Sequence, residues 1–496
     1  MKKILLAIIL LFAVMQFACS KNDAGNGNNN GSIHDDPATG QSSISSEKQT
    51  PNLPDINFNN VDFTVLLTGN WASERIQFPY IVSNELSGEI VNDAVYMRNI
   101  MIGNKYGVNI KQTDATGVDS WGARTGNGYQ IISANVFSGD TVYDAALIAT
   151  FDACSLARDG YLRDLLDVPY IDHDKPWWDP NIKRDLMINN KIYFTNGDIS
   201  ILNSVLTTCI LFNKNLIQEY NLEIPYDFVR NNKWTFDNFF EMAKSISKDL
   251  NGDGVMDAND QYGLVIWQDV VYTIYTGAGQ KIANVVGGNI ELSLYNEITV
   301  TAMNKYINFL KSEINVSVHN SYVNKSSHEK MFEENQALML TPATFYSVKN
   351  LRNMEIDFGI LPFPKLDETQ KDYFTHTHAY GNSFICIPLI VDNVEMSGII
   401  LEALAAESMY SVTPAYYDVT LTGKFFRDNE SKDMLDILFS TRTYDVGLAY
   451  QFGGYTQSLL TLINELRSEF TSMYETAERQ AHSEIEAINK AFRENN

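Results

Sequence analysis

The chain has 496 residues, of which 45% are hydrophobic and 20% are charged. Such a chain can bury more than one core, which excludes disordered, collagen-like and small disulfide-stapled proteins, and its length predicts two or three domains. Asp and Glu number 61 against 37 Lys and Arg, a net charge of −24. A chain this acidic repels a phosphate backbone, so we expect no nucleic-acid partner.

The first residues have the pattern of an export signal. Two lysines precede an apolar run from Ile4 to Met15, which is too short for a bilayer span but suits a signal-peptide core. Ala18 and Cys19 follow, and this pair resembles the lipobox of bacterial lipoproteins. We therefore predict a lipoprotein signal peptide over residues 1–18 and a lipidated Cys19 that anchors an extracytoplasmic protein to the bacterial cell membrane. Cleavage without lipidation is the alternative.

Residues 19–57 are expected to form a disordered tether. The segment from Asn22 to Pro54 is rich in Asn, Gly, Ser and Asp and nearly free of large apolar side chains, so burial cannot offset the entropy cost of ordering it. A coil of about thirty-five residues spans on the order of 30 Å, enough to hold a folded body away from a membrane. No later segment has about 18 uninterrupted apolar residues, so we expect no membrane span in that body.

Three further cysteines, Cys154, Cys209 and Cys386, lie among apolar or small neighbours without CxxC spacing. This pattern favours buried free thiols and leaves one disulfide open.

Strands and helices alternate in the first part of the predicted body. Apolar runs predict strands over 61–67, 107–110 and 143–148. Apolar residues spaced three and four apart predict helices over 91–106 and 131–138. This alternation indicates an α/β domain in which helices cover a mainly parallel sheet.

The same alternation continues along the chain. Strands are predicted over 205–212 and 262–266, a helix over 216–220, and another helix that begins after Thr235 as its N-cap. Further helices are predicted over 300–312, 330–338, 395–409, 432–439, 459–470 and 475–492.

Six short motifs occur in a fixed order. They are GYLRDL at 160–165, LFNKNL at 211–216, KWTFDNF at 233–239, FEENQALM at 332–339, FGILPFP at 358–364 and ICIP at 385–388. In the fourth motif Asn335 stands where the related segments have glycine, and Asn tolerates the left-handed conformation better than most residues. Over residues 60 to 492 the chain thereby resembles the extracellular solute-binding proteins of ABC importers, family 1, which includes maltose- and oligosaccharide-binding proteins.

The resemblance implies a two-lobe α/β periplasmic-binding-protein-like fold of class II, with the ligand cleft between the lobes. Carried onto this chain, lobe one covers residues 58–208 and 341–390, and lobe two covers 210–340 and 391–496. It further implies that the lobes close around a carbohydrate, expected to be an oligosaccharide, and deliver it to the permease subunits of an ABC transporter. Ligands of open α/β sheets bind beyond the carboxyl ends of the strands, which suits this arrangement.

Aromatic and polar residues follow the predicted strands. A sugar presents apolar faces ringed by hydroxyls, so its site needs aromatic rings beside carboxylates and amides. Core packing is the alternative for each aromatic residue, solvent exposure is the alternative for each acid, and the acids would equally suit a cationic peptide or polyamine. The candidate ligand-binding residues that follow predicted strands are Trp71, Phe151, Asp152, Trp267, Gln268 and Asp269. The resemblance adds Tyr416 and Tyr417, which lie in the C-terminal region where the family often places another aromatic residue.

Two other groups of residues are assigned structural roles. Trp177 and Trp178 lie in a loop flanked by prolines, where packing is the favoured interpretation. His376 and His378 could place two imidazoles on one strand face, but no acidic third ligand accompanies them, so a solvated loop is favoured.

The twelve residues from Asp249 to Asp260 have the spacing of an EF-hand-type loop, with glycine at position 6 and a helix before it. We predict a structural Ca²⁺ here, and an Asx-rich turn whose side chains cap the backbone is the alternative. The expected ligands are Asp249, Asn251, Asp253, the carbonyl of Val255, Asp257 and Asp260.

Motifs of catalysis are missing from the sequence. It has no HExxH, no GxSxG, no P-loop and no GxGxxG between a strand and a helix, which predicts a binding protein rather than an enzyme. Two alternatives stay open: a binding protein for a peptide or other non-sugar solute, and a surface glycoside hydrolase whose carboxylate pair cannot be singled out among 61 acids.

Overall fold

The computed structural model describes residues 48–68, 81–115, 127–257, 259–312, 316–318, 328–351, 354–417, 421 and 429–494. The chain divides into two compact units, residues 1–49 and 50–496, and every helix and strand below belongs to the second. The predicted signal peptide, Cys19, residues 19–47 of the predicted tether and Trp71 lie outside the described residues. None of the described helices has the length and apolar character needed to cross a membrane.

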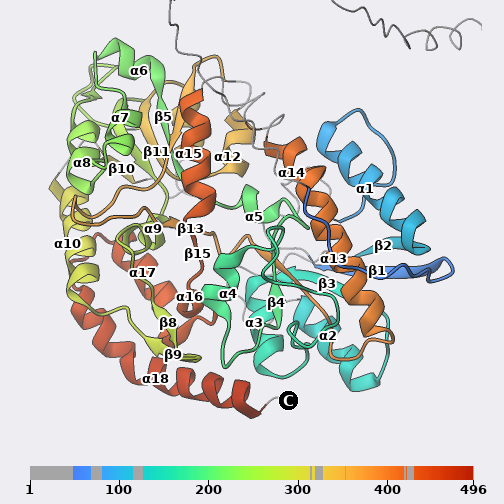
Figure 1. Ribbon diagram of the computed structural model, residues 1–496. Coiled ribbons are helices and arrows are strands. Elements are labelled where there is room, and N and C mark those ends of the chain that lie inside the picture. The colour runs from blue at the N-terminus through green and yellow to red at the C-terminus, as the bar shows by residue number, and fades with distance from the viewer. Residues whose placement is uncertain are drawn as a thin grey trace, which may run out of the picture. The chain divides into compact units, whose positions relative to one another are not determined.

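A five-stranded sheet forms the centre of lobe one (Figure 1). Its strand order is β2-β1-β3-β14-β4, with β1 parallel to β2 and β3, and with β14 antiparallel to β3 and β4. All five residues of β3 are buried, as expected for an apolar strand covered on both faces. The strands are β1 (Val61–Thr68), β2 (Val108–Ala115), β3 (Ala145–Ala149), β4 (Phe194–Thr195) and β14 (Ser383–Cys386).

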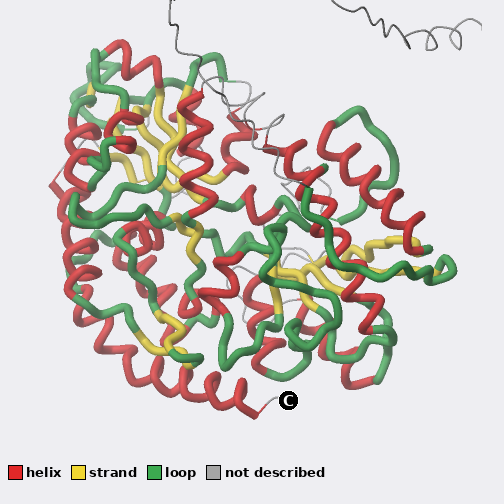
Figure 2. The backbone as a smooth tube through the Cα atoms, in the orientation of Figure 1, coloured by secondary structure: helices red, strands yellow, loops and turns green. Residues whose placement is uncertain are grey.

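Helices follow the strands of this sheet and pack beside them, as the alternation predicted. The sheet is mixed and not mainly parallel, because β14 enters it antiparallel to both of its neighbours. Figure 2 shows the helices as coiled segments around the strands of lobe one. They are α1 (Ile90–Tyr106), α2 (Asn127–Ser138), α3 (Thr150–Arg158), α4 (Pro180–Leu186), α5 (Leu202–Val205), α13 (Val394–Tyr410) and α14 (Val412–Pro414).

A second, mixed sheet forms the centre of lobe two. Its order is β10-β7-β11-β5-β12, and β6 pairs with β7 at one end. Strand β7 is parallel to β10 and β11, whereas β5 is antiparallel to β11 and β12. The strands are β5 (Thr208–Asn213), β6 (Ser247–Lys248), β7 (Gln261–Ile266), β10 (Val316–Val318), β11 (Ala337–Thr344) and β12 (Phe358–Leu361).

The helices of lobe two include the predicted one that begins after Thr235, whose hydroxyl accepts the N–H of Asn238 at 3.5 Å. The rings of Phe236 and Phe239 in this helix pack around Tyr306 and Phe363. The helices are α6 (Lys214–Glu219), α7 (Pro225–Arg230), α8 (Phe236–Lys244), α9 (Val270–Gly277), α10 (Glu297–Ser312), α11 (His328–Glu333), α12 (Phe345–Asn350), α15 (Asn429–Ser440), α16 (Val446–Ala449), η3 (Phe452–Gly454), α17 (Tyr455–Asn464) and α18 (Phe470–Glu494).

Two small sheets lie outside the central ones. Strand β8 (Ala283–Val286) forms a hairpin with β9 (Asn289–Leu292), and β13 (Thr375–His376) pairs in parallel with β15 (Arg442–Thr443).

Part of the predicted lobe assignment was wrong. Strand β12 lies in 341–390, which was given to lobe one, yet it pairs with β5 in the sheet of lobe two. Helix α13 lies in 391–496, which was given to lobe two, yet it packs on α1, and the Ser397 hydroxyl donates to the carbonyl of Asp144 at 2.9 Å. The reason is that the chain returns to lobe one through residues 377–382, just before β14, and not near residue 340.

A buried carboxylate holds α13 on lobe one. Glu402, 1% exposed, accepts the indole N–H of Trp177 at 3.0 Å and that of Trp178 at 2.8 Å. Both tryptophans are buried, which confirms that they pack in a core. Gly398 permits the close approach, because a Cβ there would lie 1.9 Å from the Pro169 carbonyl oxygen.

The predicted helix over 330–338 ends early. Helix α11 stops at Glu333, Asn335 has the left-handed φ of 63° expected from its glycine-like position, and β11 begins at Ala337. The apolar residues that extended the helical pattern therefore belong to a strand. Cys154, Cys209 and Cys386 are free and buried, as the favoured interpretation predicted.

Candidate functional site

The two lobes meet at the crossing segment, residues 375–382, which leads from β13 back to lobe one. The end of β3 reaches it, because Thr150 N–H donates to the carbonyl of Asn382 at 3.2 Å. The residues after β7 reach it from lobe two, through Asp269. The carboxyl ends of strands from both sheets therefore face one short stretch of chain, the position where ligands of α/β sheets bind.

Phe151 lies against the crossing segment as the first candidate on lobe one. Its ring meets that of Tyr380 edge to face, with centroids 5.1 Å apart, and 8% of Phe151 is exposed. Asp152 is buried and accepts the N–H of Gly128 at 3.1 Å, so this carboxylate also holds the start of α2. Whether either residue contacts a ligand stays a prediction.

Asp269 joins lobe two to the crossing segment. Its Oδ2 lies 3.0 Å from His378 Nε2, and both side chains are largely buried. Since His378 Nδ1 accepts the N–H of Gly381 at 3.2 Å, the ring proton sits on Nε2 and is donated to Asp269. The interpretation of His376 and His378 as a solvated loop was wrong: both are buried, and burial lowers the pKa of His376 to about 3.

The other candidates after β7 contact lobe two. Trp267 stacks on His328 with ring centroids 5.5 Å apart and an interplanar angle of 19°. Its backbone N–H donates to the carbonyl of Thr341 at 3.1 Å. Gln268 accepts the side-chain N–H of Asn464 at 2.7 Å. These residues are half-buried, so each presents part of its surface beside the strand ends.

The two C-terminal candidates differ in their surroundings. Tyr416 is buried, as the core-packing alternative predicted. Burial raises the pKa of its hydroxyl well above the usual range. Tyr417 donates its hydroxyl to Asp436 at 2.6 Å and packs on Phe439. Both partners of Tyr417 belong to α15.

A cavity of about 140 Å³ lies between α3 of lobe one and the chain around α16, η3 and α18. Phe151 lines it, facing a pair of stacked rings, Tyr450 and Phe452, whose centroids are 5.8 Å apart at 9°. Pockets for small molecules usually measure about 300–1,000 Å³, so an oligosaccharide would require the lobes to part. The full lining is Phe151, Cys154, Ser155, Arg158, Ala449, Tyr450, Gln451, Phe452, Glu484, Ala487 and Ile488.

Sequence reasoning missed Tyr380, Tyr450 and Phe452. The available signal was the pattern Tyr-Gln-Phe-Gly-Gly at 450–454, in which Gln451, Gly453 and Gly454 all have positive φ. Such a run turns the chain sharply between two helices and presents its aromatic side chains at the lobe boundary.

Several buried polar atoms near the crossing have no hydrogen-bond partner among the described residues. They are His376 Nε2, Thr377 Oγ1, Asn382 Nδ2 and Thr456 Oγ1. Thr456 lies near the crossing segment, because one hydroxyl contacts both. The Tyr272 hydroxyl donates to the Thr456 carbonyl at 3.1 Å and lies 3.4 Å from the hydroxyl of Tyr380. An unpaired buried polar group costs about 1–3 kcal/mol, so these atoms indicate where water or a polar ligand supplies the missing bonds.

The 249–260 loop uses its carboxylates as turn caps. Asp249 accepts the N–H groups of Gly254 at 2.8 Å and Gly252 at 2.6 Å, and these bonds lower its pKa. Buried Asp260 accepts the N–H groups of Leu250 and Asp257. In the part of the chain that the structure describes, no three His, Cys, Asp or Glu side chains come together as metal ligands.

Two α/β lobes joined beside the carboxyl ends of their strands form a periplasmic-binding-protein-like fold, which confirms the predicted fold class. A cyclo/maltodextrin-binding protein complexed with maltotetraose shares it, with TM-score 0.56, 12% identity and coverage of 85% of this chain and 96% of that chain. An ABC transporter solute-binding protein from Agrobacterium radiobacter K84 in complex with ribitol has TM-score 0.53, 12% identity and coverage of 86% and 100%.

An ABC substrate-binding protein from Listeria monocytogenes in complex with cycloalternan has TM-score 0.51 and 14% identity, and the match covers 88% of this chain and 99% of that one. At such identities the likeness shows the fold alone. No family model and no curated protein matches the chain.

Proposed function

We propose that this protein is an extracytoplasmic solute-binding protein that captures a carbohydrate, in particular an oligosaccharide, between its lobes and delivers it to an ABC permease. The observation that carries the proposal is the crossing segment, where unpaired buried polar atoms lie near aromatic rings. A hydroxyl-rich ligand with apolar faces fits both features. Solved structures of the same fold hold maltotetraose, ribitol and cycloalternan, which supports a sugar or polyol as the ligand class.

The lobes close on the ligand without catalysis, and Cys19 anchors the chain to the cell membrane. The proposed ligand contacts are Trp71, Phe151, Asp152, Trp267, Gln268, Asp269 and Tyr417, with Tyr380, Tyr450 and Phe452 added from the structure. Tyr416 packs in the core and is no longer among them. A non-sugar solute such as a peptide is the second candidate, because Asp152 and Asp269 would pair with its cations.

A thermal-shift screen of residues 50–496 against oligosaccharides, peptides and polyamines tests the ligand class. A ligand at 100 times its Kd stabilises the protein by about 2.7 kcal/mol, and we expect oligosaccharides to raise Tm. Titration calorimetry then compares Phe151→Ala with Phe137→Ala, a matched control because Phe137 is exposed on α2 of the same lobe. We expect a 10- to 100-fold loss of affinity in the first variant and none in the second, with folding verified by circular dichroism.

Other outcomes of this screen are equally informative. A response to peptides or polyamines with silence from saccharides would replace the sugar with a cationic solute. Release of shorter saccharides during incubation would contradict binding without catalysis and favour a glycoside hydrolase.

We also propose that the 249–260 loop binds a structural Ca²⁺. Its oxygen-bearing residues keep the EF-hand spacing, and Gly252 and Gly254 have the positive φ of a tight loop. The carboxylate of Asp249 accepts two backbone bonds and has about four acceptor sites, so it keeps capacity for a cation.

Calorimetry is expected to show Ca²⁺ binding to residues 50–496 at millimolar concentration or below. Asp253→Ala should abolish the heat, because it removes a ligand, whereas Asp237→Ala, on the neighbouring α8, should not. Absence of binding at millimolar Ca²⁺ would leave the loop as an Asx-rich turn.

A further inference from the structure

The strap, residues 441–445, is a short extended segment between α15 and α16. Its strand β15 pairs in parallel with β13 at the start of the crossing segment. Successive side chains of an extended chain point to opposite sides. In the strap, the side chains of Arg442 and Tyr444 contact lobe one, and that of Asp445 contacts residues near β8.

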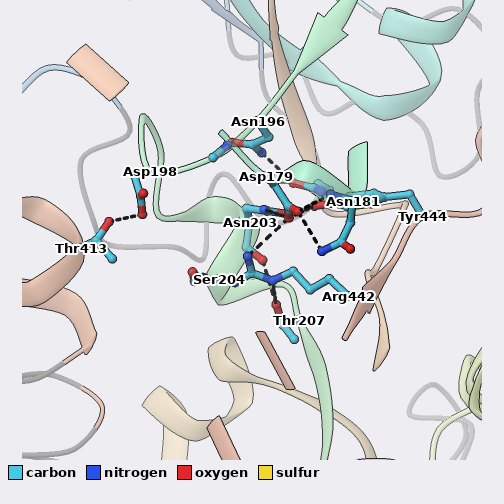
Figure 3. A network of polar contacts seen from close by, with 12 residues as sticks. Asp179, Asn181, Asn196, Asp198, Asn203, Ser204, Thr207, Thr413, Arg442 and Tyr444 are labelled. Atoms are coloured by element: carbon cyan, nitrogen blue, oxygen red, sulfur yellow. Dashed lines mark hydrogen bonds and ion pairs between the residues drawn. The ribbon is translucent and has the colours of Figure 1, made fainter. Parts of the chain in front are cut away.

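On lobe one, the carboxylate of Asp179 lies at the centre of the contacts that Arg442 and Tyr444 make (Figure 3). It is the N-cap of α4, and its Oδ1 accepts the N–H of Asn181 at 2.9 Å. Its Oδ2 accepts the side-chain N–H of Asn203 and the Tyr444 hydroxyl, both at 2.9 Å. Arg442 Nη1 lies 3.5 Å from the same oxygen.

Arg442 connects more of lobe one to the strap. Its Nε donates to the hydroxyl of Thr207 at 3.0 Å, and its Nη2 donates to the hydroxyl of Ser204 at 2.9 Å. Ser204 and Thr207 stand where the chain leaves lobe one for β5. The side chain is 11% exposed, and the guanidinium lies 4.5 Å from the centre of the Phe439 ring in α15 of lobe two.

The other end of the strap is fixed next to β8. Asp445 is buried and accepts the N–H groups of Ile282 at 2.7 Å and Ala283 at 3.3 Å. A second pair joins the same regions: Lys281 Nζ lies 2.7 Å from Asp185 of α4, which also accepts the N–H of Tyr444. Polar contacts of the strap therefore reach α4 and α5 on one side and the start of the β8–β9 hairpin on the other.

The strap leads directly into the wall of the candidate site. Asp445 begins α16, and the chain continues to Tyr450 and Phe452, which line the cavity opposite Phe151. None of the residues that contact Asp179 lines that cavity. A displacement of Arg442 and Tyr444 from lobe one would therefore move the Tyr450 side of the cavity relative to Phe151.

We infer that Arg442 and Asp179 are positioning residues that set the orientation of the two lobes, and with it the ligand affinity, without contacting the ligand. The inference about affinity rests on the proposed function, whereas the one about orientation does not. Removal of one partner of a buried ion pair leaves an uncompensated charge, which by itself destabilises the fold. The informative variant is therefore the double substitution Arg442→Met with Asp179→Asn, which removes both charges.

The experiment measures the lobe orientation directly. Spin labels on Phe137→Cys in lobe one and Tyr295→Cys in lobe two, both exposed positions, report an interlobe distance distribution by pulsed electron resonance. We expect a single narrow distribution in the parent, and a broader, shifted one in the Arg442→Met, Asp179→Asn variant. Arg230→Lys is the control, because its partners Asp227 and Asp433 both lie in lobe two and it should change nothing.

Affinity for maltotetraose is measured on the same proteins. We expect at least a 10-fold change in Kd for the double variant, partial rescue in Arg442→Lys, and no change in Arg230→Lys. An unchanged distance distribution in a folded double variant would overturn the inference. A broadened distribution with no maltotetraose binding by any protein, parent included, would support the orientation role and contradict maltotetraose as the ligand. Should the double variant fail to fold, Tyr444→Phe removes one hydroxyl and is expected to broaden the distribution to a smaller extent.

Discussion

Replacing Gly263 with alanine is expected to lower the free energy of unfolding by about 3 kcal/mol or more, the upper part of the range for overpacked cores. Gly263 lies in β7 where the last turn of α8 crosses it, and a Cβ would lie 1.6 Å from the carbonyl oxygen of Ala243. The obstacle is backbone, so no side-chain rotation relieves it. Helix α8 cannot retreat easily, because Phe236, Phe239 and Phe240 anchor it in the core of lobe two.

Urea unfolding of Gly263→Ala against the parent tests this expectation. The control is Gly287→Ala, whose Cβ would meet nothing within 4 Å but whose φ is +57°. It should cost about 1–2 kcal/mol through left-handed strain alone. Equal losses in the two variants would show that α8 moves aside and that its packing on β7 is loose.

Glu402→Gln is expected to remove part of the pH dependence of stability between pH 5 and pH 8. Burial raises the pKa of Glu402 from 4.5 to about 7, although the N–H groups of Trp178, Asp172 and Trp177 favour the anion. Because the folded pKa is the higher one, the folded state binds more protons than the unfolded state between about pH 4.5 and 7. The stabilisation from protonated Glu402 is complete below pH 4.5 and is lost as the pH rises through 7.

The measured quantity is the difference in unfolding free energy between parent and variant at each pH. The unfolding free energy of the parent minus that of the variant should fall by about 2–3 kcal/mol from pH 5 to pH 8. Taking the difference removes the contributions of neighbouring groups that titrate in the same pH range. Asp198 is one, since burial raises its pKa to about 6, and His173 is another, since burial lowers its pKa to about 4. Glu395→Gln, an exposed residue on the same helix, should leave the profile unchanged. A difference that is flat with pH would mean that Glu402 is ionised throughout.

Apolar runs and caps were enough to predict most elements of this fold. The runs at 61–67, 143–148 and 205–212 became β1, β3 and β5, because buried strands need continuous apolar residues. The N-cap at Thr235 and the left-handed Asn335 were likewise local properties. The assignment of β12 and α13 to lobes failed because the pairing of β12 with β5 joins residues more than 140 positions apart, and no local pattern encodes such a partner.

The site was harder to predict for the same reason. Phe151 and Asp269 were found because residues after strand ends reach the cleft edge, and they do contact the crossing segment. The burial of His378 and the meeting of Tyr450 with α3 depend on how the lobes face each other. Such contacts arise from tertiary packing, so the sequence offered only a turn signal around Gln451 to mark them.

Strand β14 has a consequence for how the protein folds. It occupies an inner position of the first sheet, between β3 and β4, yet it comes from residues 383–386. Because β4 pairs only with β14, the sheet of lobe one is limited to β2, β1 and β3 until nearly 390 residues have been made. The strands of the central sheet of lobe two, in contrast, are all encoded between residues 208 and 361. Contacts of such long sequence separation slow folding, since a large loop must close before they form. As the chain emerges from its N-terminus, during synthesis or export, lobe two can complete its central sheet first, so the order of assembly runs opposite to the numbering of the lobes.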